Sequence, residues 1–143
     1  MTATSTGGRV VKELIWDKSL SVEVDEIDED HRRLVELFNI LNRALEEGEP
    51  RDYIAAVLEE LIACTVWHFR HEERLMLKYR YDGLAEHKEE HDALIESARE
   101  LQQKFLQEDR SLSAGEIEFL EHWLTGHIFG ADMKMGAYLS EVM

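Results

Sequence analysis

Residues 50–80 read PRDYIAAVLEELIACTVWHFRHEERLMLKYR, a stretch that opens with proline and has no glycine after it. Proline is favoured at the start of a helix, and the apolar residues that follow recur at steps of three and four. The stretch therefore predicts one long amphipathic helix. Its inner face would carry Ile54, Val57, Leu58, Leu61, Thr65, His68, Glu72 and Met76.

Three further stretches have helical spacing: residues 29–47, residues 84–108 and a segment that opens after residue 113. Asp28 is the predicted N-cap of the first, and residues 113–116 have the S-x-x-E form of a capping box. One proline and few glycines supply too few turn residues for a β-rich fold. We predict an all-α fold, an up-down-up-down antiparallel four-helix bundle with an N-terminal arm.

The chain has 143 residues, which is the size of one domain. Residues 1–13 are small and polar at their start and are predicted to be a flexible N-terminal segment, with the bundle domain spanning 14–143. Residues 15–27 are too apolar for a free tail. We expect this arm to lie across the bundle and to bury Trp16.

Acidic residues outnumber basic ones by 31 to 16, which gives a formal net charge of -15. Phosphate groups would be repelled, so the composition excludes nucleic acid and anionic membrane as partners. The single cysteine, Cys64, excludes an internal disulfide and a CxxC motif. No apolar run is long enough for a bilayer span or a signal peptide, so we expect a cytoplasmic protein, and the acidic surface favours a monomer.

The faces that should be apolar also carry histidines. Such polar side chains are costly in a core unless they are partnered, and one alone is usually a hydrogen-bonded core residue. Five from four helices are harder to explain in that way. Converging imidazoles and carboxylates in a bundle core typically form metal sites. The residues that conflict with the pattern are His31, His68, Glu72, His87, His91 and His127.

The remaining polar candidates have weaker patterns. His71 lies toward a flank in a charged run, and His122 lies off the inner face, so a solvated or rim position is predicted for both. Cys64 is predicted to be a small buried apolar side chain.

The donor types narrow the choice of metal. Imidazole and carboxylate without a thiolate set suit iron, zinc, copper or manganese. The zinc protease motif H-E-x-x-H is absent because Lys88 follows His87, and no histidine has a glutamate three residues before it, as the ferritin-like di-iron oxidases require. Five imidazoles exceed one tetrahedral zinc site. We therefore predict two metal ions.

Five sequence elements occur over most of the chain, from about residue 14 to its end. They are Ile15-Trp16, IDEDH at 27–31, HFRHEE at 68–73, His87-x-x-x-His91, and WLTGHI at 123–128 followed by Asp132. The last four form the ordered pattern H…HxxxE…HxxxH…HxxxxD. In this order the five elements resemble the hemerythrin family, specifically the single-domain bacteriohemerythrins. Asp30 departs from the family pattern, in which glutamine is common just before the first ligand, but it lies outside the ligand set.

The resemblance implies a non-haem di-iron site, bridged by an oxo or hydroxo group, that binds dioxygen reversibly. The implied ligands are His87, His91 and His127 for one iron, His31 and His68 for the other, and Glu72 and Asp132 as bridges. Because the bridges contribute equally to both irons, the iron with two imidazoles keeps one open coordination position.

The implied function is oxygen transport, storage or delivery, without catalysis. An apolar pocket is expected around Leu124, with Trp123, Phe69 and Ile128 nearby. Two alternatives remain: a di-iron oxidase, peroxidase or nitric-oxide-handling enzyme, and a module that senses oxygen or iron. The missing Glu-x-x-His pairs argue against the enzyme, and no pattern identifies a protein that would receive the oxygen.

The last motif predicts an irregular helix. His127 and Asp132 are five residues apart, about 140° around a regular helix of 3.6 residues per turn, so they cannot point the same way from one. Gly130 lies between them and permits a break or a widened turn. We predict a helix end, a kink or a π-bulge between His127 and Asp132.

Overall fold

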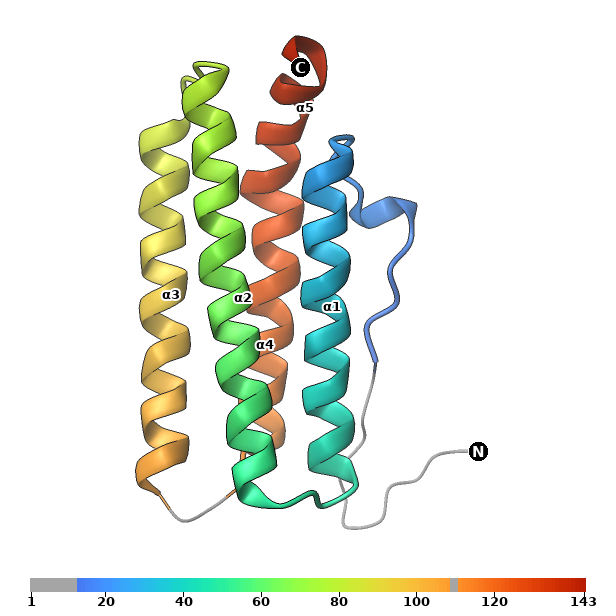
Figure 1. Cartoon of the computed structure of the whole chain (residues 1–143), viewed down its shortest axis with the longest axis vertical. Coiled ribbons are helices and arrows are strands. Elements are labelled where there is room, and N and C mark those ends of the chain that lie inside the picture. Colours follow the sequence, from blue (N-terminus) through green and yellow to red (C-terminus); the bar gives the residue numbers. More distant parts are fainter. Residues whose placement is uncertain (1–12, 109–110) are drawn as a thin grey trace.

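Four antiparallel helical columns make up the molecule (Figure 1). The computed structural model describes residues 13–108 and 111–143, and every element in these ranges is helical. The long helices are α1 (Asp25–Glu46), α2 (Arg51–Lys78), α3 (Leu84–Gln107) and α4 (Ala114–His127). A π-helical segment, η3 (Ile128–Asp132), continues α4 into α5 (Met133–Val142), so that these three segments form the fourth column.

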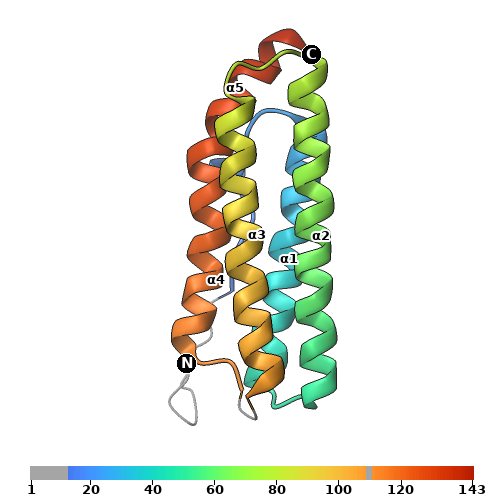
Figure 2. The same cartoon turned by 90° about the vertical axis from the view of Figure 1, so that its left-hand side faces the viewer.

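The columns are arranged as the sequence predicts. Helix α1 packs beside α2 and α4, and α3 also packs beside α2 and α4, which closes the ring of four helices (Figure 2). The all-α four-helix bundle is confirmed. Within the described ranges, no helix combines the length and the apolar character that crossing a membrane requires.

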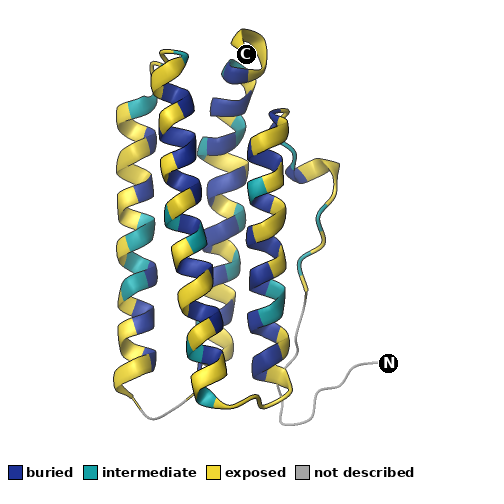
Figure 3. Cartoon of the chain, viewed as in Figure 1, coloured by how far each residue is buried: buried dark blue, intermediate teal, exposed yellow. Residues whose placement is uncertain are grey.

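Each helix turns one face inward and one face outward (Figure 3). The largest side chains that are completely enclosed include Phe38, Leu41, Leu58, Leu61 and Met76. Burial of one such side chain contributes roughly 1.5–3 kcal/mol, so the apolar layers below and above the polar centre hold the bundle closed. The polar centre described below interrupts this core.

The start of α1 differs from the prediction. The helix begins at Asp25, with Val24 as its N-cap, and Asp28 is therefore not the cap. Acidic residues in the first turn favour this earlier start because they interact with the positive end of the helix dipole. The Asp28 carboxylate instead accepts hydrogen bonds from the Val22 backbone N–H at 2.8 Å and from the Ser21 hydroxyl at 2.6 Å.

The start of α4 agrees with the prediction. The Ser113 side chain accepts a hydrogen bond from the Glu116 N–H at 3.1 Å, and the Glu116 carboxylate accepts one from the Ser113 N–H at 2.8 Å. This reciprocal pair is the predicted capping box.

The N-terminal arm runs along the outside of α1 and includes the short 3-10 turn η2 (Lys18–Leu20) (Figure 1). The side-chain amide of Asn39 holds the arm in place. It accepts a hydrogen bond from the Leu14 N–H at 2.8 Å and donates one to the Leu14 carbonyl at 2.7 Å. Trp16 packs against the core with its ring 6.4 Å from that of His31, but it stays partly exposed, so the predicted burial is only partial. The predicted flexible segment lies outside the described residues, except for Glu13.

The arm also packs against α5 at Gly136. A Cβ atom at this position would meet the Val22 carbonyl oxygen and would lie 2.7 Å from Val22 Cβ. Because the obstruction includes backbone, it cannot move aside as a flexible side chain could. Only glycine allows the arm and α5 to approach this closely.

Gly136→Ala is therefore expected to destabilise the protein by about 1–3 kcal/mol, the usual range for an overpacked core. Gly126→Ala is the matched control, because a Cβ at Gly126 in α4 meets no atom within 4 Å. That control should be neutral or should gain up to about 1 kcal/mol in helix propensity. Urea denaturation of both variants measures the difference, and a Gly136 variant as stable as the Gly126 variant would contradict the close approach.

Candidate metal centre

Seven buried polar side chains meet in the middle of the bundle. All seven are residues that the sequence singled out, and the structure brings every one of them together. They come from all four columns: His31 from α1, His68 and Glu72 from α2, His87 and His91 from α3, His127 from α4, and Asp132 from η3.

The first of two donor groups contains three imidazoles. Glu72 Oε1 lies 2.9 Å from His91 Nε2 and 3.2 Å from His87 Nε2. Asp132 Oδ1 lies 2.9 Å from both His87 Nε2 and His127 Nε2. These five donor atoms all lie within 4.8 Å of one another.

The second group contains two imidazoles and the opposite oxygens of the same carboxylates. Glu72 Oε2 lies 2.9 Å from His68 Nε2, and Asp132 Oδ2 lies 2.9 Å from His31 Nε2. Each carboxylate therefore presents one oxygen to each group. Glu72 and Asp132 are shared between the groups, and the imidazoles are divided three to two.

The donor atoms fit two metal ions. Ligands at right angles around one ion, each about 2.1 Å away, lie about 3.0 Å apart, close to most of the separations within these groups. In the second group, His31 Nε2, His68 Nε2, Glu72 Oε2 and Asp132 Oδ2 are buried and form no aligned hydrogen bond among the described residues, although three pairs lie at ion-pair distance. Buried polar atoms without a hydrogen bond are rare unless something else binds them. Imidazole and carboxylate donors suit iron, zinc, copper or manganese.

The π-helical segment places Asp132 in this centre. A π-helical hydrogen bond joins residues five apart, so His127 and Asp132 can share one side of the column. The predicted irregularity between these residues is confirmed. Gly130 does not adopt a left-handed conformation, so the widened turn, rather than glycine's conformational freedom, re-aims the carboxylate.

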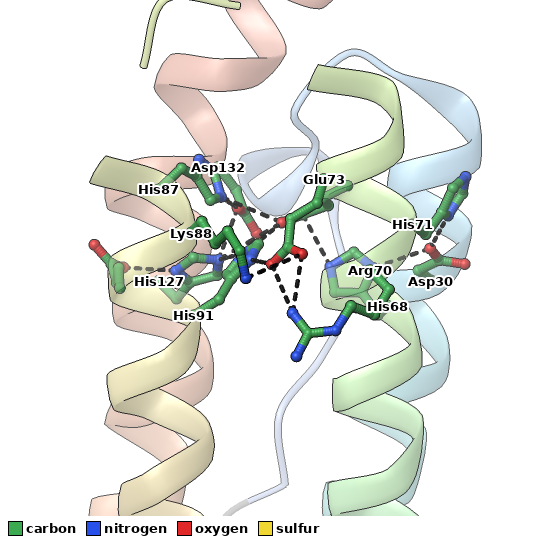
Figure 4. Close-up of polar contacts among 12 residues, drawn as sticks. Asp30, His68, Arg70, His71, Glu73, His87, Lys88, His91, His127 and Asp132 are labelled. Atoms are coloured by element: carbon green, nitrogen blue, oxygen red, sulfur yellow. Dashed lines mark hydrogen bonds and ion pairs between the residues drawn. The ribbon is translucent and has the colours of Figure 1, made fainter. Parts of the chain in front are cut away.

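Three carboxylates lie beside the outer nitrogens of three of the five histidines (Figure 4). Asp30 lies 2.9 Å from His68 Nδ1, Glu73 lies 2.8 Å from His91 Nδ1, and Glu90 lies 2.6 Å from His127 Nδ1. A carboxylate accepts the Nδ1 proton, which leaves the Nε2 lone pair facing the centre, as metal ligation requires. The sequence reasoning missed all three, and in particular it set Asp30 aside.

The polar residues that were predicted to be solvated have different positions. His122 is exposed, as predicted. His71, for which a solvated or rim position was predicted, is buried and contacts Asp30 and Glu26, so the solvated alternative is wrong. The error arises because both carboxylates lie on α1, where spacing along α2 cannot reveal them. Cys64 is partly rather than fully buried.

The cluster has strongly shifted protonation equilibria. Burial lowers the pKa of His68, but the charges of Glu72 and Asp30 outweigh it and raise the pKa to about 10. Burial also lowers the pKa of His87 and of His127, but Asp132 and Glu72 outweigh it and raise these pKa values to about 9 and about 11. Burial also raises the pKa of Glu72, yet the surrounding histidines hold it well below its usual value. In the metal-free centre, His68, His87 and His127 are thus protonated beside the two carboxylates.

A small cavity of about 10 Å³ adjoins the second donor group. This volume is enough for roughly one water-sized molecule. The cavity borders His31 and His68, together with His127 and Asp132, but neither His87 nor His91. The pocket residues that the sequence singled out, Leu124, Trp123, Phe69 and Ile128, all line it, together with Leu34 and Thr65, which were not assigned to the pocket.

The cavity walls are themselves fixed. The Phe69 ring stacks on His91 at 3.8 Å and 6°, which couples the cavity to the three-histidine group. The Trp123 indole N–H donates to the Leu94 carbonyl at 2.9 Å. Both aromatic side chains are therefore held in one orientation.

Known proteins share this architecture and sequence pattern. Residues 22–139 match the family model described as the hemerythrin HHE cation-binding domain. A bacteriohemerythrin of Stenotrophomonas maltophilia is 33% identical over 90% of this chain and 81% of its own length. A myohemerythrin of Riftia pachyptila is 32% identical over 84% of this chain and 88% of its own length.

Solved structures agree with the sequence comparison. A crystal structure of wild-type hemerythrin superimposes with a TM-score of 0.81 at 31% sequence identity, covering 89% of this chain and 98% of that one. The family model spans most of the chain, and the relatives exceed 30% identity over most of their length. The chain belongs to the hemerythrin family.

Proposed function

We propose that the chain holds two iron ions in this centre and binds dioxygen reversibly, for oxygen transport, storage or delivery. The observation that supports this most strongly is the division of five imidazoles, three to two, around two shared carboxylates. His87, His91 and His127 would hold one iron, and His31 and His68 the other, with Glu72 and Asp132 between them. An iron held by one imidazole fewer keeps a coordination position for a small ligand.

When bound, the two irons supply a pair of one-electron donors at adjacent positions. The protein's part is to hold them together and to limit what reaches them. Glu72 and Asp132 would bind both, and the cavity beside His31 and His68 would admit one small molecule on the side with fewer ligands.

The side chains that line the cavity favour reversible binding of oxygen rather than its further reaction. Leu34, Phe69, Leu124 and Ile128 are apolar, and they exclude water from the ligand position. The hydroxyl of Thr65 donates to the Leu61 carbonyl at 2.7 Å, so its proton is already engaged. Apart from the proposed ligands, no residue with an acidic or basic side chain is among the described residues that line the cavity.

An iron count combined with absorption spectroscopy tests this function. The purified protein should contain two irons per chain, and its visible spectrum should change on oxygenation and return on removal of oxygen over repeated cycles. Steady oxygen consumption with an added reductant would instead indicate an oxidase. Two irons without any response to oxygen would refute oxygen binding.

Removal of the metal should destabilise the bundle. The donors come from all four columns, so iron binding is coupled to folding. A ligand at a thousand times its Kd stabilises a protein by about 4 kcal/mol, which corresponds to a rise in Tm of roughly 10 °C for a chain of this size. Calorimetry of the metal-free and iron-loaded proteins measures this, and equal Tm values would contradict a shared internal site.

The metal-free protein should lose stability in alkali. Because folding raises the pKa of His68, His87 and His127 from 6.5 to about 9–11, their contribution is complete below pH 6.5 and is lost as the pH rises through 9–11. We expect a progressive loss of several kcal/mol between pH 6.5 and 10, because one pKa unit corresponds to about 1.4 kcal/mol for each group. In the iron-loaded protein the imidazoles are unprotonated ligands, so this loss should be absent.

Chemical denaturation of both forms across this pH range measures the difference between them. Because the general repulsion of an acidic chain acts on both forms, the difference isolates the histidine cluster. Parallel pH profiles would show that the imidazoles are not involved in metal binding.

Leu124→Phe should obstruct the cavity. A larger side chain in about 10 Å³ of space creates an overpacking penalty of about 1–3 kcal/mol, or roughly 10–100-fold weaker binding of a small ligand. Azide titration of the oxidised, iron-loaded protein measures this, and Leu106→Phe at an exposed position of α3 is the control. Two irons and unchanged azide affinity in the Leu124 variant would remove Leu124 from the ligand's path.

A further inference from the structure

We propose that His71 is a positioning residue for the metal centre, which acts by fixing Asp30 behind His68. The proposal rests on the function proposed above, because it takes His68 as an iron ligand. His71 is not one of the seven residues of the centre, and its place in the charged run of α2 favours a solvated position. The structure instead gives it two partly buried contacts.

The contacts form a continuous chain from α2 to α1 and back to α2 (Figure 4). Asp30 Oδ2 lies 2.9 Å from His68 Nδ1 and 2.6 Å from His71 Nδ1. The other ring nitrogen of His71, Nε2, lies 2.7 Å from Glu26 Oε1. Both ring nitrogens of His71 therefore lie within hydrogen-bond distance of a carboxylate oxygen. His71 is thereby held at both ends and cannot rotate without breaking a bond.

The bridge is shielded from solvent. The side chains of His71 and Asp30 are 11% and 15% exposed, and only Glu26, at 50%, reaches well into water. The Trp67 ring lies 5.5 Å from the His71 ring and covers part of its outer surface. Hydrogen bonds between shielded charged groups are stronger than those on an open surface.

A parallel arrangement serves the other half of the centre. Arg70, the neighbour of His71, donates to both oxygens of Glu73 at 2.9 and 3.0 Å. Glu73 in turn accepts from His91, a proposed ligand of the other iron. Two consecutive residues of α2 therefore each hold a carboxylate behind a proposed ligand, one for each metal. Arg70 is 45% exposed, so the His71 bridge is the better shielded of the two.

The bridge has a definite physical effect. An outer carboxylate fixes the tautomer and the orientation of a ligating imidazole, and loss of such a partner typically weakens metal binding about 10–100-fold. Without His71, Asp30 keeps one hydrogen bond in place of two and can turn away from His68. His71 should therefore affect iron affinity only through Asp30.

A double-mutant cycle tests this dependence. The metal-free protein and three variants, His71→Leu, Asp30→Ala and the double variant, are titrated anaerobically with ferrous iron against a chromophoric chelator. We expect Asp30→Ala to weaken one of the two irons about 10–100-fold and His71→Leu to weaken the same iron by about tenfold. The double variant should bind no more weakly than Asp30→Ala alone, because His71 has no effect once Asp30 is gone.

Two further variants separate positioning from folding. His71→Gln retains an amide donor and should recover most of the affinity, whereas His122→Leu, at an exposed histidine, should change nothing. The Tm of each metal-free variant reports any loss of fold. The proposal is wrong if His71→Leu lowers only this Tm, if it leaves both affinities unchanged, or if the double variant shows the product of the two single effects. Failure of the unmodified protein to bind two irons would refute the proposed function instead.

Discussion

Two carboxylates, Glu72 and Asp132, are completely enclosed in the centre of this bundle, and the surrounding structure is arranged to compensate for their charge. An isolated buried carboxylate is highly unfavourable, so it must have partners of opposite charge or a bound metal. Five imidazoles from four columns supply those partners. In the metal-free protein His68, His87 and His127 carry protons, since the pKa of each rises to about 9–11. A metal ion at either donor group would take over the role of those protons.

The same requirement explains the one irregular helix. A regular α-helix through residues 127–132 would aim Asp132 away from His127, leaving the three-histidine group with one carboxylate oxygen fewer. The π-helical turn of η3 restores the geometry. Downstream of that turn, α5 packs so closely on the arm that only glycine fits at position 136. The irregular turn and the close contact both belong to the fourth column.

Most of the bundle and six of the seven inward polar residues were predictable because their signals are local, whereas Asp132 was assigned through the resemblance to the hemerythrin family. Apolar residues repeat every three or four positions, and a histidine on such a face is visible as a conflict within its own helix. The five-residue step from His127 to Asp132 was equally visible. The start of α1 was missed because Asp28 resembles an N-cap in sequence, whereas its partners, Ser21 and Val22, lie in the arm.

The residues behind the histidines were less accessible to sequence reasoning. Asp30 contacts His68 across 38 positions, and Glu90 contacts His127 across 37, so neither contact has a local pattern. His71 was misassigned for the same reason, because its carboxylate partners belong to another helix. Contacts between helices depend on how the columns rotate about their axes, which the periodicity of one helix does not determine.

A crystal structure of the iron-loaded, oxidised protein with azide, phased at the iron absorption edge, tests the central claim most directly. We expect two iron peaks between Glu72 and Asp132, with azide on the iron that His31 and His68 hold, inside the cavity beside Leu124. A single iron peak, or azide on the iron held by His87, His91 and His127, would contradict this claim.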